Sequence, residues 1–338
     1  MPFINQTSPH ISARETTWTF MGDMLIALLP LAGMAYYYYG LRALLHILFS
    51  VLTCWCADHV CTLLSGRRPQ ISDFSSIVTG ALVALLMPAA APYWVTVVGG
   101  LFAILVVKQA FGGLGSNIFN PAAGGLAFLT ICFPKYVTAY TAPFARLEIW
   151  GTVTAAAVES PTAILSYGGL PTQDWSDCLL GNYAGPMGAT NLLVVFTCML
   201  FLAVRKALNF RIPLAYLLTV LLWAWCFPRG MIPRLDSLIF ELGGSTVLFY
   251  GFFLAGDPVT SPRTNPGKWI YGVCCGVFVM LFRYYGAYQT SAPFALLLAN
   301  GLSNAFDRLV LTALYGTSKP RFPKRSRIKG YRKPPKTV

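Results

Sequence analysis

Long apolar runs, separated by short polar segments, dominate this chain. A helix needs about 20 apolar residues to cross the hydrocarbon core of a bilayer, so the pattern predicts about ten transmembrane helices. The runs lie at roughly 20–39, 42–64, 76–91, 93–110, 119–133, 188–206, 211–228, 240–256, 268–284 and 292–314. The third, fifth and eighth runs are short for a straight span, which favours broken or tilted helices there.

Two of the apolar stretches are interrupted by glycine, proline and asparagine. Residues 111–125 read FGGLGSNIFNPAAGG, and residues 254–267 read LAGDPVTSPRTNPG. Lipid offers a free amide no hydrogen-bond partner, so irregular backbone at membrane depth must face protein, a ligand or water. Interruptions at corresponding places in two halves of a chain also indicate a central ligand site.

A weak internal repeat relates residues 76–130 to residues 247–302. In each stretch an apolar run ends near a proline, a glycine-rich run follows, and another apolar run begins after a proline. With five runs per half, the halves must face opposite ways across the bilayer. We therefore predict an all-α integral membrane protein with two inverted five-helix repeats and broken helices. Its predicted parts are a five-helix half at 1–133, an external segment at 134–187, a second half at 188–316 and a basic tail at 317–338.

Composition and charge support a membrane location. Hydrophobic residues make up 56% of the 338 positions and charged residues 11%, and the mean hydropathy is +0.59. The net charge is +13, but nine of the 25 Lys and Arg residues fall in the last twenty positions, where there is no acid. Such a tail is typical of the cytoplasmic side next to anionic lipid, and we expect no nucleic-acid partner. Both termini are predicted to be cytoplasmic, and the polar N-terminus predicts no cleavable signal peptide.

Known metal and nucleotide motifs are not found in the sequence. Its nine Cys and three His lack the spacing of zinc or iron–sulfur sites, so we expect no metal held by this chain alone. The chain also has no Walker A, GxSxG or HExxH motif, and we assign no catalytic residue.

Two charged residues stand beside the interruptions. Lys108 ends an apolar run, where it could snorkel to the interface or face a cavity and an anionic ligand. Asp257 stands between an apolar run and a proline, where it could form a turn or handle ions or protons. We take Lys108 as a candidate cofactor-binding residue and Asp257 as a candidate for an ion pathway.

The first interruption also carries amides beside glycines. Asn117 and Asn120 offer hydrogen-bonding amides, and Gly113 and Gly115 would let a planar ligand approach the backbone closely. We take these four as candidate cofactor-binding residues, while Asn120 could equally form a structural turn before its proline.

Three ordered motifs resemble one membrane protein family. They are SPHI at 8–11, KQAFGGLGSNIFNPAAGG at 108–125 and FFLAGDPVTSPRTNPGKWIYG at 252–272. Together they look like the membrane D subunit of the Rnf complex and, more distantly, the B subunit of the Na+-pumping NADH:quinone oxidoreductase. The resemblance implies electron transfer between ferredoxin and NAD, coupled to Na+ or H+ movement in the bacterial inner membrane. It also implies flavoprotein and iron–sulfur subunits as partners, without which the chain would be inactive.

The resemblance further implies two flavins. One is FMN near the outer face, joined to a threonine by a phosphoester, and the other is a deeper, non-covalent flavin, expected to be riboflavin. Thr162 occupies the acceptor position, although Ala156, Glu159 and Pro161 depart from the family pattern D-A-V-S/T-x-A-T-P-L. Thr190 is an alternative acceptor, and the absence of covalent flavin is a third reading.

A different class of function fits the pattern without the resemblance. Two five-helix repeats with interrupted helices are typical of secondary transporters, so a channel or transporter for a small polar solute is the alternative.

Overall fold

The computed structural model describes residues 17–66, 74–151, 153, 155–229, 232–244, 246–286 and 291–316. Within these ranges every regular element is a helix, and there is no strand. The SPHI motif, Arg67, Arg68 and the basic tail lie outside the described residues.

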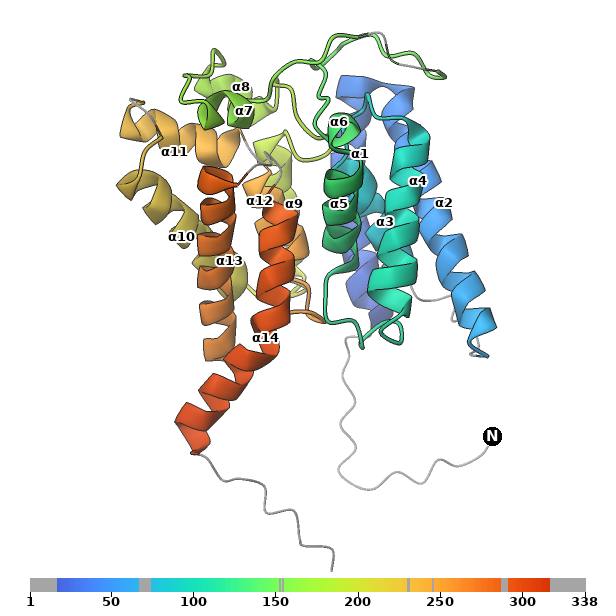
Figure 1. The fold of residues 1–338 in the computed structure, drawn as a ribbon, viewed down its shortest axis with the longest axis vertical. Coiled ribbons are helices and arrows are strands. Elements are labelled where there is room, and N and C mark those ends of the chain that lie inside the picture. Colours follow the sequence, from blue (N-terminus) through green and yellow to red (C-terminus); the bar gives the residue numbers. More distant parts are fainter. Residues whose placement is uncertain are drawn as a thin grey trace, which may run out of the picture.

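Long helices stand side by side, and shorter ones gather at one end (Figure 1). The first half contains α1 (Thr17–Tyr39), α2 (Leu41–Leu64), α3 (Ser75–Leu85), α4 (Tyr93–Phe102) with its π-helical continuation η1 (Ala103–Gln109), and α5 (Pro121–Cys132). The second half contains α9 (Leu192–Val204), α10 (Arg211–Cys226), α12 (Val247–Phe249) with its π-helical continuation η2 (Tyr250–Leu254), α13 (Asn265–Tyr285) and α14 (Ala292–Tyr315). The end drawn uppermost carries α6 (Pro134–Val137), α7 (Pro161–Ser166), α8 (Trp175–Leu180) and α11 (Arg234–Gly243).

Three of the described helices are long and apolar enough to cross a membrane unaided, namely α1, α2 and α14. The bent pair formed by α11 and α12–η2 would make a fourth span, and five further apolar helices are shorter. Every predicted run contains a helix, and the first two runs match α1 and α2 to within three residues at each end. The described fold is that of an all-helical membrane protein.

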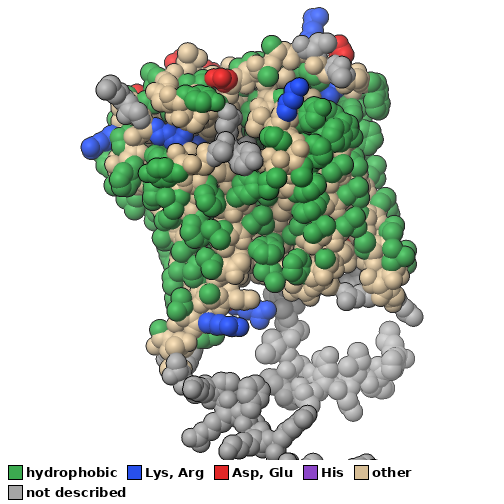
Figure 2. All heavy atoms as spheres, in the orientation of Figure 1, with side chains coloured by type: hydrophobic (Ala, Val, Ile, Leu, Met, Phe, Trp, Pro, Cys, Tyr) green, Lys and Arg blue, Asp and Glu red, His purple; other side chains and the backbone are tan. Residues whose placement is uncertain are grey.

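Apolar side chains cover the flanks of the bundle. In Figure 2 hydrophobic residues spread over the middle of the visible face, whereas Lys, Arg, Asp and Glu side chains gather toward its two ends. Large aliphatic side chains such as Leu29, Leu52 and Leu222 are exposed on the outer helices. An apolar belt between polar ends is the surface that a bilayer requires.

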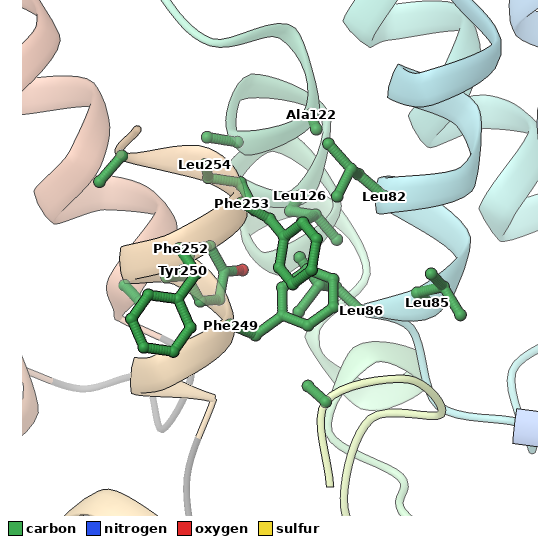
Figure 3. Close-up of a cluster of buried hydrophobic side chains, with 14 of the residues drawn as sticks. Leu82, Leu85, Leu86, Ala122, Leu126, Phe249, Tyr250, Phe252, Phe253 and Leu254 are labelled. Atoms are coloured by element: carbon green, nitrogen blue, oxygen red, sulfur yellow. The ribbon is translucent and has the colours of Figure 1, made fainter. Parts of the chain in front are cut away.

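One hydrophobic core runs through both halves. The largest cluster of buried side chains extends along the chain from Met21 to Phe306. Figure 3 shows its centre, where Phe249 and Phe253 of the α12–η2 segment lie beside Leu82 of α3 and Leu126 of α5. The two predicted halves therefore pack directly against each other and share this core.

Two glycines let α13 approach α10 closely. Gly272 and Gly276 are four residues apart and so lie on one face of α13. A Cβ atom at Gly272 would lie 2.7 Å from the carbonyl oxygen of Ile212, and one at Gly276 would lie 2.7 Å from Cβ of Thr219. This is the small-residue contact that commonly joins helices within membranes.

Replacing Gly272 with alanine is expected to lower the free energy of unfolding by about 1–3 kcal/mol, because the added methyl meets backbone that must shift. Gly33→Ala in α1 is the matched control, since a Cβ there meets nothing within 4 Å. That control should be neutral or stabilise the helix by up to about 1 kcal/mol. Unfolding of the purified protein in detergent measures both changes, and equal losses would contradict this account of the α10–α13 contact.

Candidate functional site

The two interrupted segments share one local construction. The helix before each interruption, α4 in the first half and α12 in the second, ends in a π-helical stretch. In such a stretch a backbone N–H bonds to the carbonyl five residues earlier. The N–H of Ala110 donates to Leu105 O at 3.2 Å, and the N–H of Ala255 donates to Tyr250 O at 2.8 Å. π-Helical turns are rare and frequently occur at functional sites. Their presence just before both interruptions sets these two segments apart from the other helices described.

A turn and a capped helix follow each π-helical stretch. Gly113 and Gly115 have φ of +92° and +87° in the first turn, a conformation that favours glycine. The next helix begins with Asn120, whose side chain accepts from Ala123 N at 3.2 Å. The second turn ends likewise at Thr264, which caps α13. Asn120 thus caps the helix through its side-chain oxygen, which agrees with the structural role that the sequence left open for it. Its amide nitrogen remains available for a further contact.

That amide nitrogen joins the two interruptions. Asn120 Nδ2 donates to Leu254 O at 3.3 Å and lies 3.5 Å from Asp257 Oδ2. A cavity of about 50 Å³ lies where the two turns meet. Its polar lining comprises Ser75, Thr79, Lys108, Asn117, Asn120 and Asp257. The structure therefore brings four of the sequence candidates together, whereas Gly113 and Gly115 shape the adjoining turn without lining the cavity.

Asp257 provides the carboxylate on this cavity. Its Oδ1 accepts from Val259 N at 3.2 Å, and its Oδ2 accepts from Thr260 Oγ1 at 3.3 Å. Among the described residues, no Lys, Arg or His forms an ion pair with Asp257. Asp257 combines the turn-forming role with a carboxylate that faces a cavity, so its negative charge is available to a cation.

Lys108 is held by an ion pair and does not snorkel. It lies in η1 and is only 2% exposed. Its Nζ is 2.9 Å from Asp58 Oδ2 and donates to Ser75 Oγ at 2.6 Å. Gln109 Nε2 donates to the other oxygen of Asp58. Snorkelling is therefore excluded as an explanation of Lys108, and Asp58 is the partner that compensates its charge.

The size and chemistry of the cavity suit water or a small cation. A water molecule takes about 30 Å³ in the liquid, so about 50 Å³ holds one or two such species. Asn117 Oδ1 is buried there without a hydrogen-bond partner, and Asp257 supplies carboxylate oxygens. Oxygen ligands of this kind suit hard cations. No three His, Cys, Asp or Glu side chains in the described ranges lie close enough together to form a metal site.

Thr162 lines a second cavity at the opposite end of the bundle. It lies in the first turn of α7 and is half-buried, and its Oγ1 is 2.9 Å from Ser160 Oγ. The cavity itself measures about 20 Å³. Its polar lining comprises Tyr140, Ser160, Thr162, Tyr183, Thr246, Arg283 and Ser291. Thr162 and Arg283 thus line the same polar recess.

The alternative acceptor, Thr190, is enclosed. It is 2% exposed and lies two residues before the start of α9. The N-cap of α9 is the next residue, Asn191, whose side chain accepts from Val194 N at 3.0 Å. A hydroxyl that must be reached by a modifying enzyme is better placed at Thr162 than at Thr190.

Sequence reasoning missed a buried charge cluster beside the Thr162 cavity. Arg229 Nε is 3.1 Å from Glu241 Oε1, and Arg283 Nη2 is 2.8 Å from Glu241 Oε2. None of the three residues is more than 9% exposed. The sequence did contain a sign of this cluster, because Glu241 and Arg283 each place a charge within an apolar run. Charges at such positions are buried on folding and require partners.

Comparisons with known proteins agree with the family resemblance of the three sequence motifs. The sequence model described as the NQR2, RnfD, RnfE family matches residues 4–316. The chain is 35% identical to the D subunit of the Na(+)-translocating ferredoxin:NAD(+) oxidoreductase complex of Acetobacterium woodii, over 93% of this chain and 95% of the relative.

Two further relatives are named as D subunits of ion-translocating oxidoreductase complexes. The protein from Actinobacillus succinogenes is 30% identical over 87% of this chain and 92% of its own length. The protein from Shewanella frigidimarina is 29% identical over 94% of this chain and 99% of its own length. The match confirms the resemblance carried by the interrupted motifs, and the chain belongs to the NQR2, RnfD, RnfE family.

Proposed function

We propose that this chain is the flavin-carrying membrane subunit of an ion-translocating electron transport complex. In this proposal it relays electrons between ferredoxin and NAD, and the relay is coupled to Na+ or H+ transport. Family membership and relatives named as D subunits of such complexes support the assignment. The structural observation that supports a covalent flavin is the polar recess lined by both Thr162 and Arg283.

The covalent cofactor of this proposal is FMN on Thr162. A flavin transferase would join the Thr162 oxygen to the flavin-side phosphorus of flavin adenine dinucleotide. The pyrophosphate bond breaks, adenosine monophosphate leaves, and the hydroxyl proton is released. The residues present suit the phosphate of the product, because the half-buried hydroxyl lies in a recess lined by Arg283 and further hydroxyls. The recess measures about 20 Å³, so the flavin ring would lie outside it. The flavin supplies the redox chemistry, while this chain fixes its position and surroundings.

The proposed ion pathway passes the cavity between the two interruptions. Asp257 and Asn117 offer oxygens to a cation there, and Lys108 on the wall is paired with the carboxylate of Asp58. A cavity of about 50 Å³ is far smaller than the roughly 300 Å³ and more that organic ligands occupy. The cavity therefore does not fit an enclosed flavin. Riboflavin stays part of the proposal with no residue assigned to it. Cofactor binding by Lys108, Asn117, Asn120, Gly113 and Gly115 stays a prediction.

The proposed membrane arrangement has ten crossings in two inverted five-helix repeats. It is supported by the opposite directions of α5 and α14, the helices that follow Pro121 and Pro293 in the aligned repeats (Figure 1). In this arrangement both termini face the cytoplasm of a bacterial inner membrane, and α7 and Thr162 face outward. The proposed partners are flavoprotein and iron–sulfur subunits, which this chain needs for activity.

Thr162→Ala is expected to abolish covalent flavin. The complex is expressed with its flavin transferase and denatured in SDS, and the band of this chain is examined under ultraviolet light. Wild type should fluoresce and Thr162→Ala should be dark, whereas Ser166→Ala, an exposed hydroxyl on the same helix, should fluoresce like wild type. Mass mapping of the fluorescent peptide distinguishes Thr162 from Thr190.

A dark wild-type band would overturn the covalent cofactor. If purified protein in liposomes then carried a small polar solute, the transporter alternative would replace the proposal. The polar cavity between interrupted helices is the feature that such a transporter would use.

A further inference from the structure

The charge cluster beside Thr162 holds more cation than anion. Two guanidiniums, from Arg229 and Arg283, are paired with the single carboxylate of Glu241, which is fully buried. Backbone carbonyls take further donors, because Arg229 Nη2 donates to Arg283 O at 2.6 Å and Arg283 Nη1 donates to Glu241 O at 3.2 Å. Burying charge is costly without a counter-charge, so an anion placed against this cluster would be strongly favoured.

The cluster faces the Thr162 recess through Arg283. Arg283 lines that cavity, whereas Arg229 and Glu241 do not. Arg229 is instead packed over the ring of Tyr284, with its Cζ 4.2 Å from the ring centre. Glu241 contacts both Nη atoms of Arg283, and Arg283 lines the same cavity as Thr162.

A second, independent feature of the recess also requires a partner. Ser291 is 3% exposed and lines the cavity, and its Oγ has no hydrogen-bond partner among the residues that the structure describes. A buried hydroxyl without a partner is costly, and it can donate to an anionic oxygen.

Tight packing keeps the acceptor helix against this cluster. Gly244 follows Glu241 by three residues at the end of α11. A Cβ atom at Gly244 would lie 2.9 Å from Cβ of Pro161, the residue before Thr162. The absence of a side chain at Gly244 therefore allows α7 to lie directly on α11, which carries the carboxylate that holds Arg283.

We propose that Arg283, oriented by Glu241 and Arg229 and assisted by Ser291, binds the phosphate that links the flavin to Thr162. The linking phosphodiester carries one negative charge, and the three described side chains of the cluster, Arg229, Glu241 and Arg283, together carry one net positive charge. Guanidinium and hydroxyl donors around a phosphate are also the usual recognition chemistry for this group. Arg283 is thus a positioning residue for the proposed covalent flavin, and the inference depends on that proposal.

The test measures flavin incorporation into an assembled complex made without the transferase. Transferase and flavin adenine dinucleotide are then added, and the covalent flavin of this chain is followed by in-gel fluorescence. Arg283→Gln is expected to incorporate flavin at least about tenfold more slowly, because the phosphate loses hydrogen bonds from a charged donor. Arg283→Lys, which keeps the charge but loses the planar fork, should be intermediate. Arg234→Gln removes an exposed cation on α11 outside the recess and should match wild type.

A second readout separates positioning from a merely structural role. In fully loaded complexes, Arg283→Gln should shift the midpoint potential of the covalent flavin to more negative values. A nearby cation favours the added electron, so Arg283→Lys should stay close to wild type. Ser291→Ala removes no charge and should slow incorporation about threefold, which keeps the test valid if Arg283→Gln fails to accumulate.

The outcomes also separate this inference from the proposed function. If the wild-type chain takes up no covalent flavin, both the proposed covalent cofactor and the phosphate-binding role of Arg283 are wrong. A wild-type chain labelled at Thr162, with Arg283→Gln and Ser291→Ala unchanged in rate and potential, defeats the phosphate-binding role alone.

Discussion

Replacing Asp58 with alanine is expected to lower the free energy of unfolding by about 3–5 kcal/mol, because the buried ammonium of Lys108 loses a carboxylate at ion-pair distance. Lys108 is 2% exposed, and its Nζ lies 2.9 Å from Asp58. Ser75 would remain as a hydrogen-bond acceptor, but a hydroxyl carries no charge to replace the carboxylate. Unfolding of the purified protein in detergent, followed by helical circular dichroism, measures the loss.

Two comparison variants make this prediction specific. In the double variant Asp58→Leu with Lys108→Met both charges are absent, so most of the lost stability should return. Asp23→Ala breaks a pair whose basic side chain, Arg205, is 53% exposed, and its effect should be far smaller because water screens that pair. Equal losses for Asp58→Ala and Asp23→Ala, or no recovery in the double variant, would contradict the buried-pair account.

The helices of this fold could be located from the sequence because a bilayer imposes a minimum apolar length. The predicted run at 20–39 corresponds to the helix Thr17–Tyr39, and the predicted run at 42–64 corresponds to the helix Leu41–Leu64. The π-helical stretches were not predictable, because they change which carbonyl each N–H reaches without changing composition. The short helices of the segment at 134–187 were missed for a related reason, since they lack the long apolar run on which the prediction relied.

The candidate site was predictable in its residues but not in their pairing. Broken segments identified Asn120 and Asp257, and the structure brings these two side chains within 3.5 Å of each other. The partner of Lys108 lies 50 positions away in the chain, and no local pattern identifies a contact of that range. The same limit hid the Arg229–Glu241–Arg283 cluster, whose members lie on three separate segments.

Replacing Asp257 with asparagine is expected to reduce ion uptake driven by electron transfer at least about tenfold, because ion–carboxylate interactions contribute a few kcal/mol. The substitution keeps the size of the side chain, and its amide oxygen can still accept from Val259 N. Only the negative charge on the cavity is lost. The measurement uses the whole complex in liposomes, with uptake of Na+ or H+ recorded per electron transferred.

This substitution also distinguishes the two readings of Asp257. If the residue serves only as a turn former, asparagine should replace it without effect, because asparagine stabilises the same turn. Asp307→Asn is the matched control, since Asp307 binds Arg263 N and Thr264 of the same loop but does not line the cavity. Normal uptake in Asp307→Asn and strongly reduced uptake in Asp257→Asn, with covalent flavin unchanged in both, would place ion movement at the cavity where the two interruptions meet. Unchanged uptake in Asp257→Asn would remove Asp257 from the ion pathway and leave it as the residue that shapes the turn.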